Sequence, residues 1–358
     1  MRQLASIKRI TDIQPIEGKD RIVLAMVDGW SVIVQKSEFQ VGDLCVYVEI
    51  DSVLPEKPEF EFLRSKNFRI KTMKMAGVIS QGICFPLSIL PAGRSYQEGE
   101  DVTELIGVTQ YEPTMDKERD DDNTPKKKYP RWVMRNKLLR RLILGKKKGG
   151  SKAFPSFVHK TDETRIQNMP FILKDKQPYV ATEKIDGQSG TFALVRHKHF
   201  LRRDTFEYIV CSRNYRLPKP DNSSYWSVSN YYNIEDILKD WIGKDDWIAI
   251  QGECVGPGIQ KNKYHLDRYD LYVFNVITPN GRLGSVQAKK LCGMDGLNFV
   301  PILQTDYVLP DTVNEVLEYA HGKSALYDTL REGIVFRSQD GKHSFKAVDP
   351  LFLLKYDE

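Results

Sequence analysis

Long apolar runs and closely spaced cysteines are missing from this sequence of 358 residues, and no signal peptide is expected at its start. No apolar stretch approaches the roughly 20 residues that a helix needs to cross a bilayer, and mixed charges stand where a signal peptide would be apolar. The five cysteines are scattered and no two have the Cys-x-x-Cys spacing, so neither a zinc site nor a disulfide framework is expected. We therefore expect an intracellular protein in a reducing compartment, without membrane contact.

Acidic residues are missing from one segment. Residues 126–152 contain twelve Lys or Arg and no Asp or Glu, and without these twelve cations the net charge of +5 would become −7. Such a cluster suits a polyphosphate backbone, because neutralised phosphates release their counterions. The alternative is a solvated basic linker. The residues that we expect to contact nucleic acid are Arg140, Arg141, Lys146, Lys147 and Lys148.

Short runs with strand character dominate the first hundred residues. They lie at 21–26, 30–35, 44–50 and 82–86, and turn pairs such as Asp28-Gly29 separate them. A spacing of about ten residues between short strands predicts a small β-barrel. An OB-type barrel, which binds single strands or duplex backbones, and an SH3-like barrel both fit this spacing.

The pattern changes after this barrel. Residues 111–152 break the strand spacing, and apolar residues at helical intervals predict a short amphipathic helix within the basic segment. Further along, strands are expected at 179–184, 189–195, 207–213, 247–253, 269–277 and 333–337, helices at 234–241 and 313–319, and helix N-cap chemistry at 161–164. The predicted organisation is a barrel at 1–110, a charged linker at 111–152 and a mixed α and β domain at 153–358.

Six short motifs follow one another in the second half. They are EKIDGQS (183–189), SRN (212–214), IQGECVG (250–256), YVFNV (272–276), EGIVFR (332–337) and FKAV (345–348). Each alone is weak, since Lys-x-Asp-Gly occurs by chance in roughly one chain in ten of this length. Together and in this order they resemble the covalent nucleotidyltransferase superfamily of RNA ligases, DNA ligases and capping enzymes.

The place of the barrel narrows this resemblance. DNA ligases and capping enzymes of the superfamily usually carry an OB domain after the last lysine motif, whereas this sequence ends twelve residues after Lys346. The phrases VGDLCVYVEIDSVLP (41–55), SQGICFPLS (80–88) and KTDETRIQN (160–168) are similar to ATP-dependent RNA ligases with an N-terminal OB module, the fifth Rnl family. The implied fold is α+β, with an OB-type barrel before a nucleotidyltransferase domain of antiparallel sheets and flanking helices.

The resemblance also implies a reaction. A lysine attacks ATP to form lysyl–AMP, AMP passes to a 5′-phosphate end, and a 3′-hydroxyl end displaces AMP. The implied cofactors are ATP and Mg²⁺ or Mn²⁺, and the implied partner is RNA or an RNA-containing nicked duplex with its 3′-hydroxyl on RNA. A monomer is favoured. Two alternatives are a DNA ligase or GTP-using capping enzyme, and an inactive nucleic-acid-binding protein.

By this resemblance Lys184 is the nucleophile. A free lysine with a pKa of about 10.4 is protonated at neutral pH, so its pKa must fall before it attacks. Asp186, Glu253 and Glu332 resemble the acids that hold a hydrated metal ion, which would lower that pKa by like-charge repulsion. The alternatives are a surface lysine and structural salt bridges.

The other motif positions are expected to bind the nucleotide. Arg213 would contact the ribose, Phe274 and Val335 would enclose the adenine unless both are core residues, and Lys346 would contact the α-phosphate. The final motif carries Val348 where the superfamily has a second lysine, and Lys355 is the candidate replacement. The remaining expected contacts are Glu183, Gly187, which would allow a tight turn, and Ser189.

Overall fold

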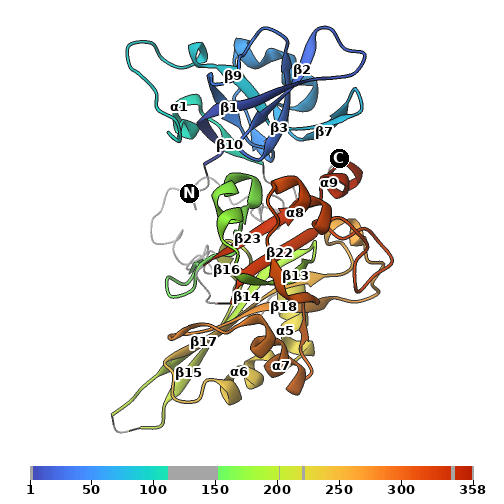
Figure 1. The fold of residues 1–358 in the computed structure, drawn as a ribbon. Coiled ribbons are helices and arrows are strands. Elements are labelled where there is room, and N and C mark those ends of the chain that lie inside the picture. The colour runs from blue at the N-terminus through green and yellow to red at the C-terminus, as the bar shows by residue number, and fades with distance from the viewer. Residues whose placement is uncertain (1–2, 112–151, 201, 220–221, 340–342, 357–358) are drawn as a thin grey trace, which may run out of the picture.

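The computed structural model describes residues 3–111, 152–200, 202–219, 222–339 and 343–356 (Figure 1), and all structural statements below concern these residues. The expected phosphate contacts Arg140, Arg141, Lys146, Lys147 and Lys148 lie outside this part of the chain, and so does the helix predicted around them. None of the described helices is long and apolar enough to cross a membrane.

A long strand organises the N-terminal region, residues 3–111. Strand β1 pairs with β4 through its first half and with β2 through its second half, which continues the sheet in the order β3-β2-β1-β4-β9. Trp30 and Tyr47 are fully buried inside the curved sheet. The strands are β1 (Ala5–Pro15), β2 (Ile22–Val27), β3 (Trp30–Gln35), β4 (Leu44–Val48), β5 (Ser52–Val53), β6 (Arg69–Ile70), β7 (Thr72–Met75), β8 (Val78–Gln81), β9 (Ile83–Pro86) and β10 (Thr109–Gln110), with helices η1 (Pro58–Lys66), η2 (Leu87–Ile89) and α1 (Thr103–Ile106).

Two sheets form the C-terminal region, residues 152–356. The larger contains β11 (Lys152–Ala153), β16 (Tyr215–Arg216), β15 (Thr205–Cys211), β14 (Gln188–His197), β17 (Trp247–Val255), β18 (Asp270–Thr278) and β19 (Gly281–Arg282) in this spatial order, with β20 (Asn298–Phe299) on β18. The smaller contains β12 (Thr164–Arg165), β23 (Ser344–Val348), β22 (Gly333–Ser338), β13 (Pro178–Lys184) and β21 (Ile302–Val308). Pairing is antiparallel except in the two short pairs β12–β23 and β18–β20.

Helices cover one face of each sheet. The opposite face of the smaller sheet carries polar residues such as Lys184, whereas the opposite face of the larger sheet packs partly against the apolar residues Phe154, Phe157 and Val158. The apolar core of the larger sheet includes residues of α5, α6 and α7, and that of the smaller sheet includes Val316 and Ala320 of α8. The helices are α5 (Ser224–Tyr231), α6 (Ile234–Trp241), α7 (Ser285–Met294), α8 (Val313–Ala320) and α9 (Pro350–Tyr356), with short 3-10 turns η3 (Ile166–Asn168), η4 (Pro170–Lys174) and η5 (Gln260–Asn262). The chain passes from the smaller to the larger sheet between β13 and β14.

The prediction of helix N-cap chemistry at 161–164 was wrong. Residues 164–165 form β12, which pairs in parallel with β23, and no side chain caps the turn η3 that follows. The guanidinium of Arg165 bonds Asp51 of the N-terminal region at 3.0 Å. Backbone pairing on one side and this ion pair on the other hold the segment extended.

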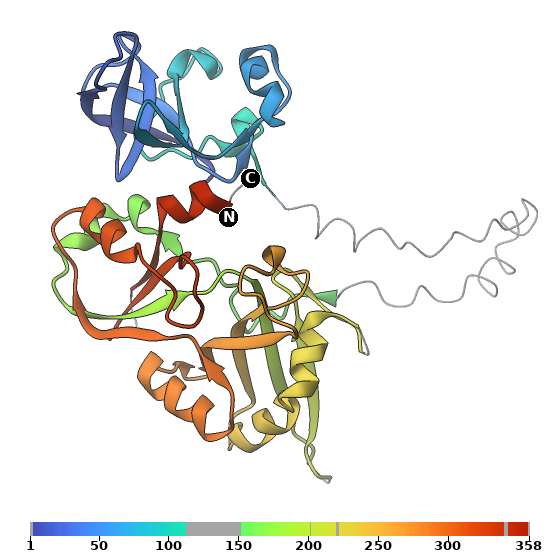
Figure 2. The same cartoon turned by 90° about the vertical axis from the view of Figure 1, so that its right-hand side faces the viewer.

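The two regions contact each other beside these residues. The indole N–H of Trp30 donates to Asn168 at 2.7 Å, and the backbone N–H of Gly29 donates to the carbonyl of Gln167 at 3.1 Å. Helix α9 lies between the two regions in Figure 2, and its Leu353 packs against the N-terminal core. The C-terminal helix therefore belongs to both packing surfaces.

Candidate active site

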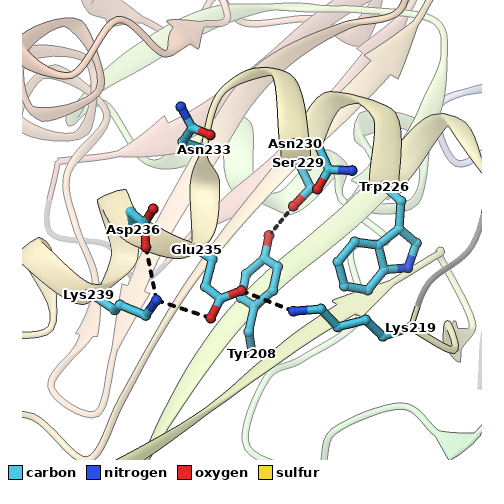
Figure 3. Close-up of a pocket in the computed structure, with 9 residues that line it drawn as sticks. All are labelled: Tyr208, Lys219, Trp226, Ser229, Asn230, Asn233, Glu235, Asp236 and Lys239. Atoms are coloured by element: carbon cyan, nitrogen blue, oxygen red, sulfur yellow. Dashed lines mark hydrogen bonds and ion pairs between the residues drawn. The ribbon is translucent and has the colours of Figure 1, made fainter.

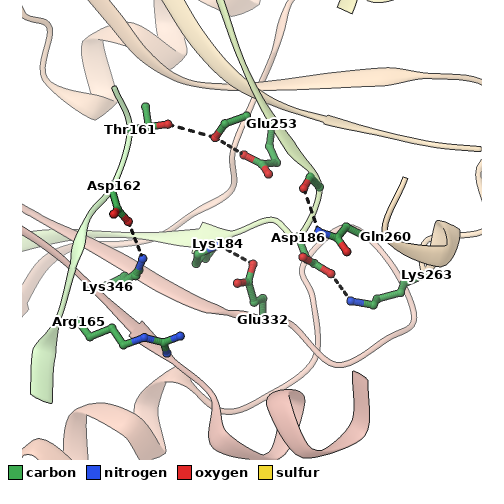
Figure 4. A network of polar contacts seen from close by, with 12 residues as sticks. Thr161, Asp162, Arg165, Lys184, Asp186, Glu253, Gln260, Lys263, Glu332 and Lys346 are labelled. Atoms are coloured by element: carbon green, nitrogen blue, oxygen red, sulfur yellow. Dashed lines mark hydrogen bonds and ion pairs between the residues drawn. The ribbon is translucent and has the colours of Figure 1, made fainter. Parts of the chain in front are cut away.

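Lys184 ends β13 on the polar face of the smaller sheet. It pairs across the sheet with Gly333 of β22, while Ala181 on the opposite face is fully buried in the core. Its ammonium donates to Glu332 Oε2 at 2.6 Å (Figure 4), and the two side chains are 25% and 13% exposed. A lysine this enclosed is not an ordinary surface lysine.

Two further carboxylates surround this ion pair. Asp186 follows Lys184 in the turn, and its backbone N–H donates to the hydroxyl of Tyr264 at 2.9 Å. Glu253 comes from the larger sheet, where it is the cross-strand neighbour of Ser189, and its Oε2 accepts from the Ser189 hydroxyl at 3.0 Å. Three acids from three separate segments therefore meet around one lysine.

Burial and mutual repulsion set the charge of this group. Burial raises the pKa of Glu253 to about 7. The positive charge of Lys184 lowers this pKa, and the negative charge of Glu332 raises it further. Burial likewise raises the pKa of Asp186 to about 6, and Glu332 adds to the shift. Burial lowers the pKa of Lys184, but the carboxylates of Glu332 and Glu253 raise it by more, so its pKa exceeds the ordinary value. The acids thus hold the amine in its unreactive, protonated form.

This donor set fits a hydrated divalent cation. Hard carboxylates whose pKa values are raised by repulsion gain from an added positive charge, and such a charge also removes the field that keeps Lys184 protonated. Within the described ranges no three His, Cys, Asp or Glu side chains are grouped closely enough to hold an ion directly. Contact through the water shell of the ion fits both observations.

A second polar group lies on the other side of Lys184. Lys346 pairs in register with Val335, which pairs with Thr182, so all three side chains share the face that carries Lys184. The ammonium of Lys346 lies 3.3 Å from Asp162 Oδ1, and the guanidinium of Arg213 lies 3.7 Å from the same oxygen. Asp162 thus ties together the two cations that the motifs predict for nucleotide binding.

Besides Gly187, three predicted nucleotide contacts lie outside these two groups. Phe274 is half-buried against the core of the larger sheet, at an irregularity in the pairing of β17 and β18. Glu183 is 1% exposed, and its carboxylate accepts from the backbone N–H of Ala325 at 2.7 Å, so only its backbone is left to reach a nucleotide. Lys355 is exposed at the end of α9, with its ammonium 4.9 Å from the centre of the Tyr356 ring.

Gly187 is needed for space rather than for a left-handed turn. It is not among the glycines with a positive φ, but a Cβ there would lie 2.3 Å from the carbonyl oxygen of Cys254. The turn after Lys184 therefore passes directly against β17. A side chain at this position would push the nucleophile away from Glu253.

The loop between β17 and β18 also reaches the site, although no motif predicted it. Gln260, Lys261 and Asn262 all have positive φ, and the loop folds back onto the turn after Lys184. The Gln260 amide donates to the carbonyl of Gly187 at 3.4 Å, and the ammonium of Lys263 contacts the carboxylate of Asp186. The Gly-Pro-Gly run at 256–258 was an available turn signal for this loop.

A separate pocket lies beside helices α5 and α6 (Figure 3). It is lined by Tyr208, Lys219, Trp226, Ser229, Asn230, Asn233, Glu235, Asp236 and Lys239. Several of its polar groups already pair with one another, for example Tyr208 with Ser229 at 2.6 Å and Lys219 with Glu235 at 3.2 Å. No motif residue lines it, so the candidate chemistry stays with Lys184.

Comparisons with known proteins agree with this architecture. An OB-fold domain model matches residues 4–87, and an RNA ligase family model matches residues 177–356. No curated protein sequence matches the chain. The OB-type interpretation of the barrel and the α+β organisation are confirmed.

Solved structures of a Naegleria gruberi RNA ligase resemble the whole chain at 29% identity. The structure with PPi has a TM-score of 0.81 and covers 100% of this chain and 99% of its own. A glutamate-to-alanine mutant with ATP and Mn has a TM-score of 0.81 and covers 100% of both chains. A lysine-to-methionine mutant with AMP and Mn has a TM-score of 0.81 and covers 99% of both chains.

Proposed function

Because the chain belongs to the RNA ligase family, we propose that it joins 3′-hydroxyl and 5′-phosphate ends with ATP, through a lysyl–AMP bond at Lys184. The observation that carries this proposal is the enclosed Lys184, 2.6 Å from Glu332 and within the field of Asp186 and Glu253. The similar ligase structures with ATP, AMP, PPi and Mn support it.

Lys184 acts as the nucleophile in the first step. Its ammonium must first lose a proton, and Glu332 Oε2 at 2.6 Å is placed to accept it. The amine nitrogen then bonds the α-phosphorus of ATP, and the bond to the bridging oxygen breaks, so pyrophosphate leaves with the electron pair. Asp186, Glu253 and Glu332 would hold a hydrated Mg²⁺ or Mn²⁺, which supplies positive charge to the amine and the phosphate.

The other motif residues bind and orient the nucleotide. Lys346 would contact the α-phosphate and Arg213 the ribose, since both already converge on Asp162. Phe274 and Val335 would enclose the adenine, and Ser189 would orient Glu253 through their hydrogen bond. AMP then passes to a 5′-phosphate end, and the 3′-hydroxyl end attacks that phosphorus and expels AMP.

We propose nicked duplexes with RNA on the 3′-hydroxyl side as the substrate, sealed by a monomer inside the cell. Because a site that bonds a substrate hydroxyl rejects analogues without it, sealing should be about tenfold or more faster with RNA than with DNA at that end. Sealing rates on nicks that differ only in RNA or DNA at the 3′-hydroxyl end test the substrate. Protein labelling with ATP compared with GTP tests the nucleotide donor. Equal rates on RNA and DNA ends, or equal labelling by GTP, would contradict the proposal.

We further propose that the basic segment at 126–152 binds substrate phosphates and takes no part in chemistry on ATP. If roughly five of its twelve cations contact phosphates, they contribute about −4 to −5 to the slope of log affinity against log salt. Replacing Lys146, Lys147 and Lys148 with alanine should weaken nicked-duplex binding and flatten that slope. The rate of lysyl–AMP formation should stay unchanged.

The matched control for this prediction replaces three lysines elsewhere. Lys244, Lys289 and Lys290 are exposed on the C-terminal region, so their alanine variants remove the same charge from another surface. Equal losses of affinity in both triple variants would point to general charge rather than to the segment. An unchanged salt slope in the first variant would leave only a solvated linker.

A further inference from the structure

Besides Lys184 itself, the described strands of the smaller sheet place one lysine, Lys346, on the face that carries the nucleophile. Strand β23 places Lys346 on this face and Val348 at the next position of the same face. Val348 is 1% exposed and pairs with Gly333, which in turn pairs with Lys184. The cross-strand row Lys184, Gly333 and Val348 therefore ends in an apolar side chain, at the position where the superfamily motif has its second lysine.

A second, mostly buried ammonium reaches the acids around Lys184 from the larger sheet. Lys263 comes from the loop between β17 and β18, its side chain is 11% exposed, and its ammonium contacts the carboxylate of Asp186. The rings of Phe352 and Tyr356 in α9 lie with their centres 4.7 Å from this ammonium. These two cation–π contacts hold the long Lys263 side chain in one orientation.

Lys263 lies on one side of the nucleophile, whereas Lys346 and Arg213 lie on the other. Figure 4 shows Lys346 with Asp162 on one side of Lys184 and Lys263 with Asp186 on the other. Arg213 belongs to the Asp162 side, because it shares that carboxylate with Lys346. If the ribose lies toward Arg213 and the α-phosphate lies at Lys184, a triphosphate that continues past the nucleophile has its β- and γ-phosphates on the side of Lys263.

We propose that Lys263 is the second phosphate-binding cation of this site and contacts the β- and γ-phosphates of ATP and the leaving pyrophosphate. An ammonium has three N–H donors, and the only hydrogen bond of Lys263 within the described part of the chain goes to Asp186. The remaining donors are free for phosphate oxygens. This inference rests on the proposed function, since it assigns a role within lysine adenylylation.

Binding measurements on the full chain test the proposal without catalysis. In a Lys184→Ala background, which cannot react, calorimetry with Mn²⁺ would compare ATP, AMP and inorganic pyrophosphate. Adding Lys263→Ala should weaken ATP and pyrophosphate binding about tenfold to a hundredfold, the usual loss for a charge-assisted hydrogen bond, and leave AMP within about twofold. Equal weakening of AMP would overturn the proposal, because Lys263 would then only support the turn around Asp186.

A rescue variant sharpens the test. Position 348 shares the face of Lys184, so Val348→Lys in the Lys263→Ala protein should restore ATP affinity, whereas Val348→Met, which adds length without charge, should not. Equal recovery with both substitutions would contradict a role for charge. If thermal unfolding shows that the protein with Val348→Lys does not fold, the comparison of ATP with AMP decides alone.

The first step of catalysis separates this inference from the proposed function. A wild-type protein that forms no lysyl–AMP would refute the proposed function itself. A wild-type protein that forms lysyl–AMP, together with a Lys263→Ala variant of unchanged ATP affinity, would refute only the role of Lys263. Lys263→Arg keeps the charge and should retain most of the ATP affinity.

Discussion

Replacing Lys184 with alanine should abolish the transfer of label from α-labelled ATP to the protein and leave the sealing of a nick with a preformed 5′-adenylate intact. The reason is that the amine is consumed only when the enzyme–AMP bond forms. Backbone pairing of β13 with β22 on one side and β21 on the other does not depend on this side chain. The measurements are gel labelling with ATP and single-turnover sealing of the adenylylated nick.

A lysine in the connection between η4 and β13 provides the control. Lys176 lies eight residues earlier, pairs with Asp311, and is 48% exposed, so Lys176→Ala removes a charge without touching the acids around Lys184. It should label like the wild type. Normal labelling of Lys184→Ala would show that another residue is the nucleophile. Loss of sealing on the adenylylated nick in a folded Lys184→Ala protein would give this lysine a role beyond the first step.

Most strands and helices could be predicted from the sequence, because apolar and polar residues alternate in the strands and apolar residues recur at helical intervals in the helices. The strand at 30–35 and the helix at 234–241 have the predicted bounds, and most other predicted strands end within two residues of the observed ones. Helix α5 was missed because Ser224–Tyr231 is rich in Ser, Tyr and Asn and has no strong helix former. Strand β1 was missed because charged and polar residues interrupt its alternation.

The site could be predicted only where a short motif carries it. Lys184 and Glu332 are 148 positions apart, yet each stands in a recognisable phrase, so their proximity was expected. Lys263 and Asp162 stand in no motif with a role attached, and what they do depends on which carboxylates and cations the fold brings beside them. Glu183 shows the converse, since a residue beside the nucleophile in sequence turns its carboxylate to the other face of the strand.

Replacing Glu332 or Glu253 with alanine should slow lysyl–AMP formation, the second largest effect expected. Two consequences of the replacement act on this rate in opposite directions. These acids raise the pKa of Lys184, so losing one makes the amine easier to deprotonate. Each also contributes to holding the ion that activates the amine and neutralises the phosphate, an effect of several kcal/mol. A pKa change of one unit is about 1.4 kcal/mol, so the loss should dominate, and each alanine variant should form lysyl–AMP about a thousandfold more slowly.

The dependence on metal concentration separates the two consequences. If the acids hold the ion, Glu332→Ala and Glu253→Ala should need more Mn²⁺ for half-maximal labelling, and Mn²⁺ binding measured without ATP should weaken. Asp328→Ala, which removes a 90% exposed acid four residues before Glu332, should change neither quantity. Rates equal to or above the wild type in both variants at limiting metal would show that these acids only pair with Lys184, because the relief of its raised pKa would then be the whole effect.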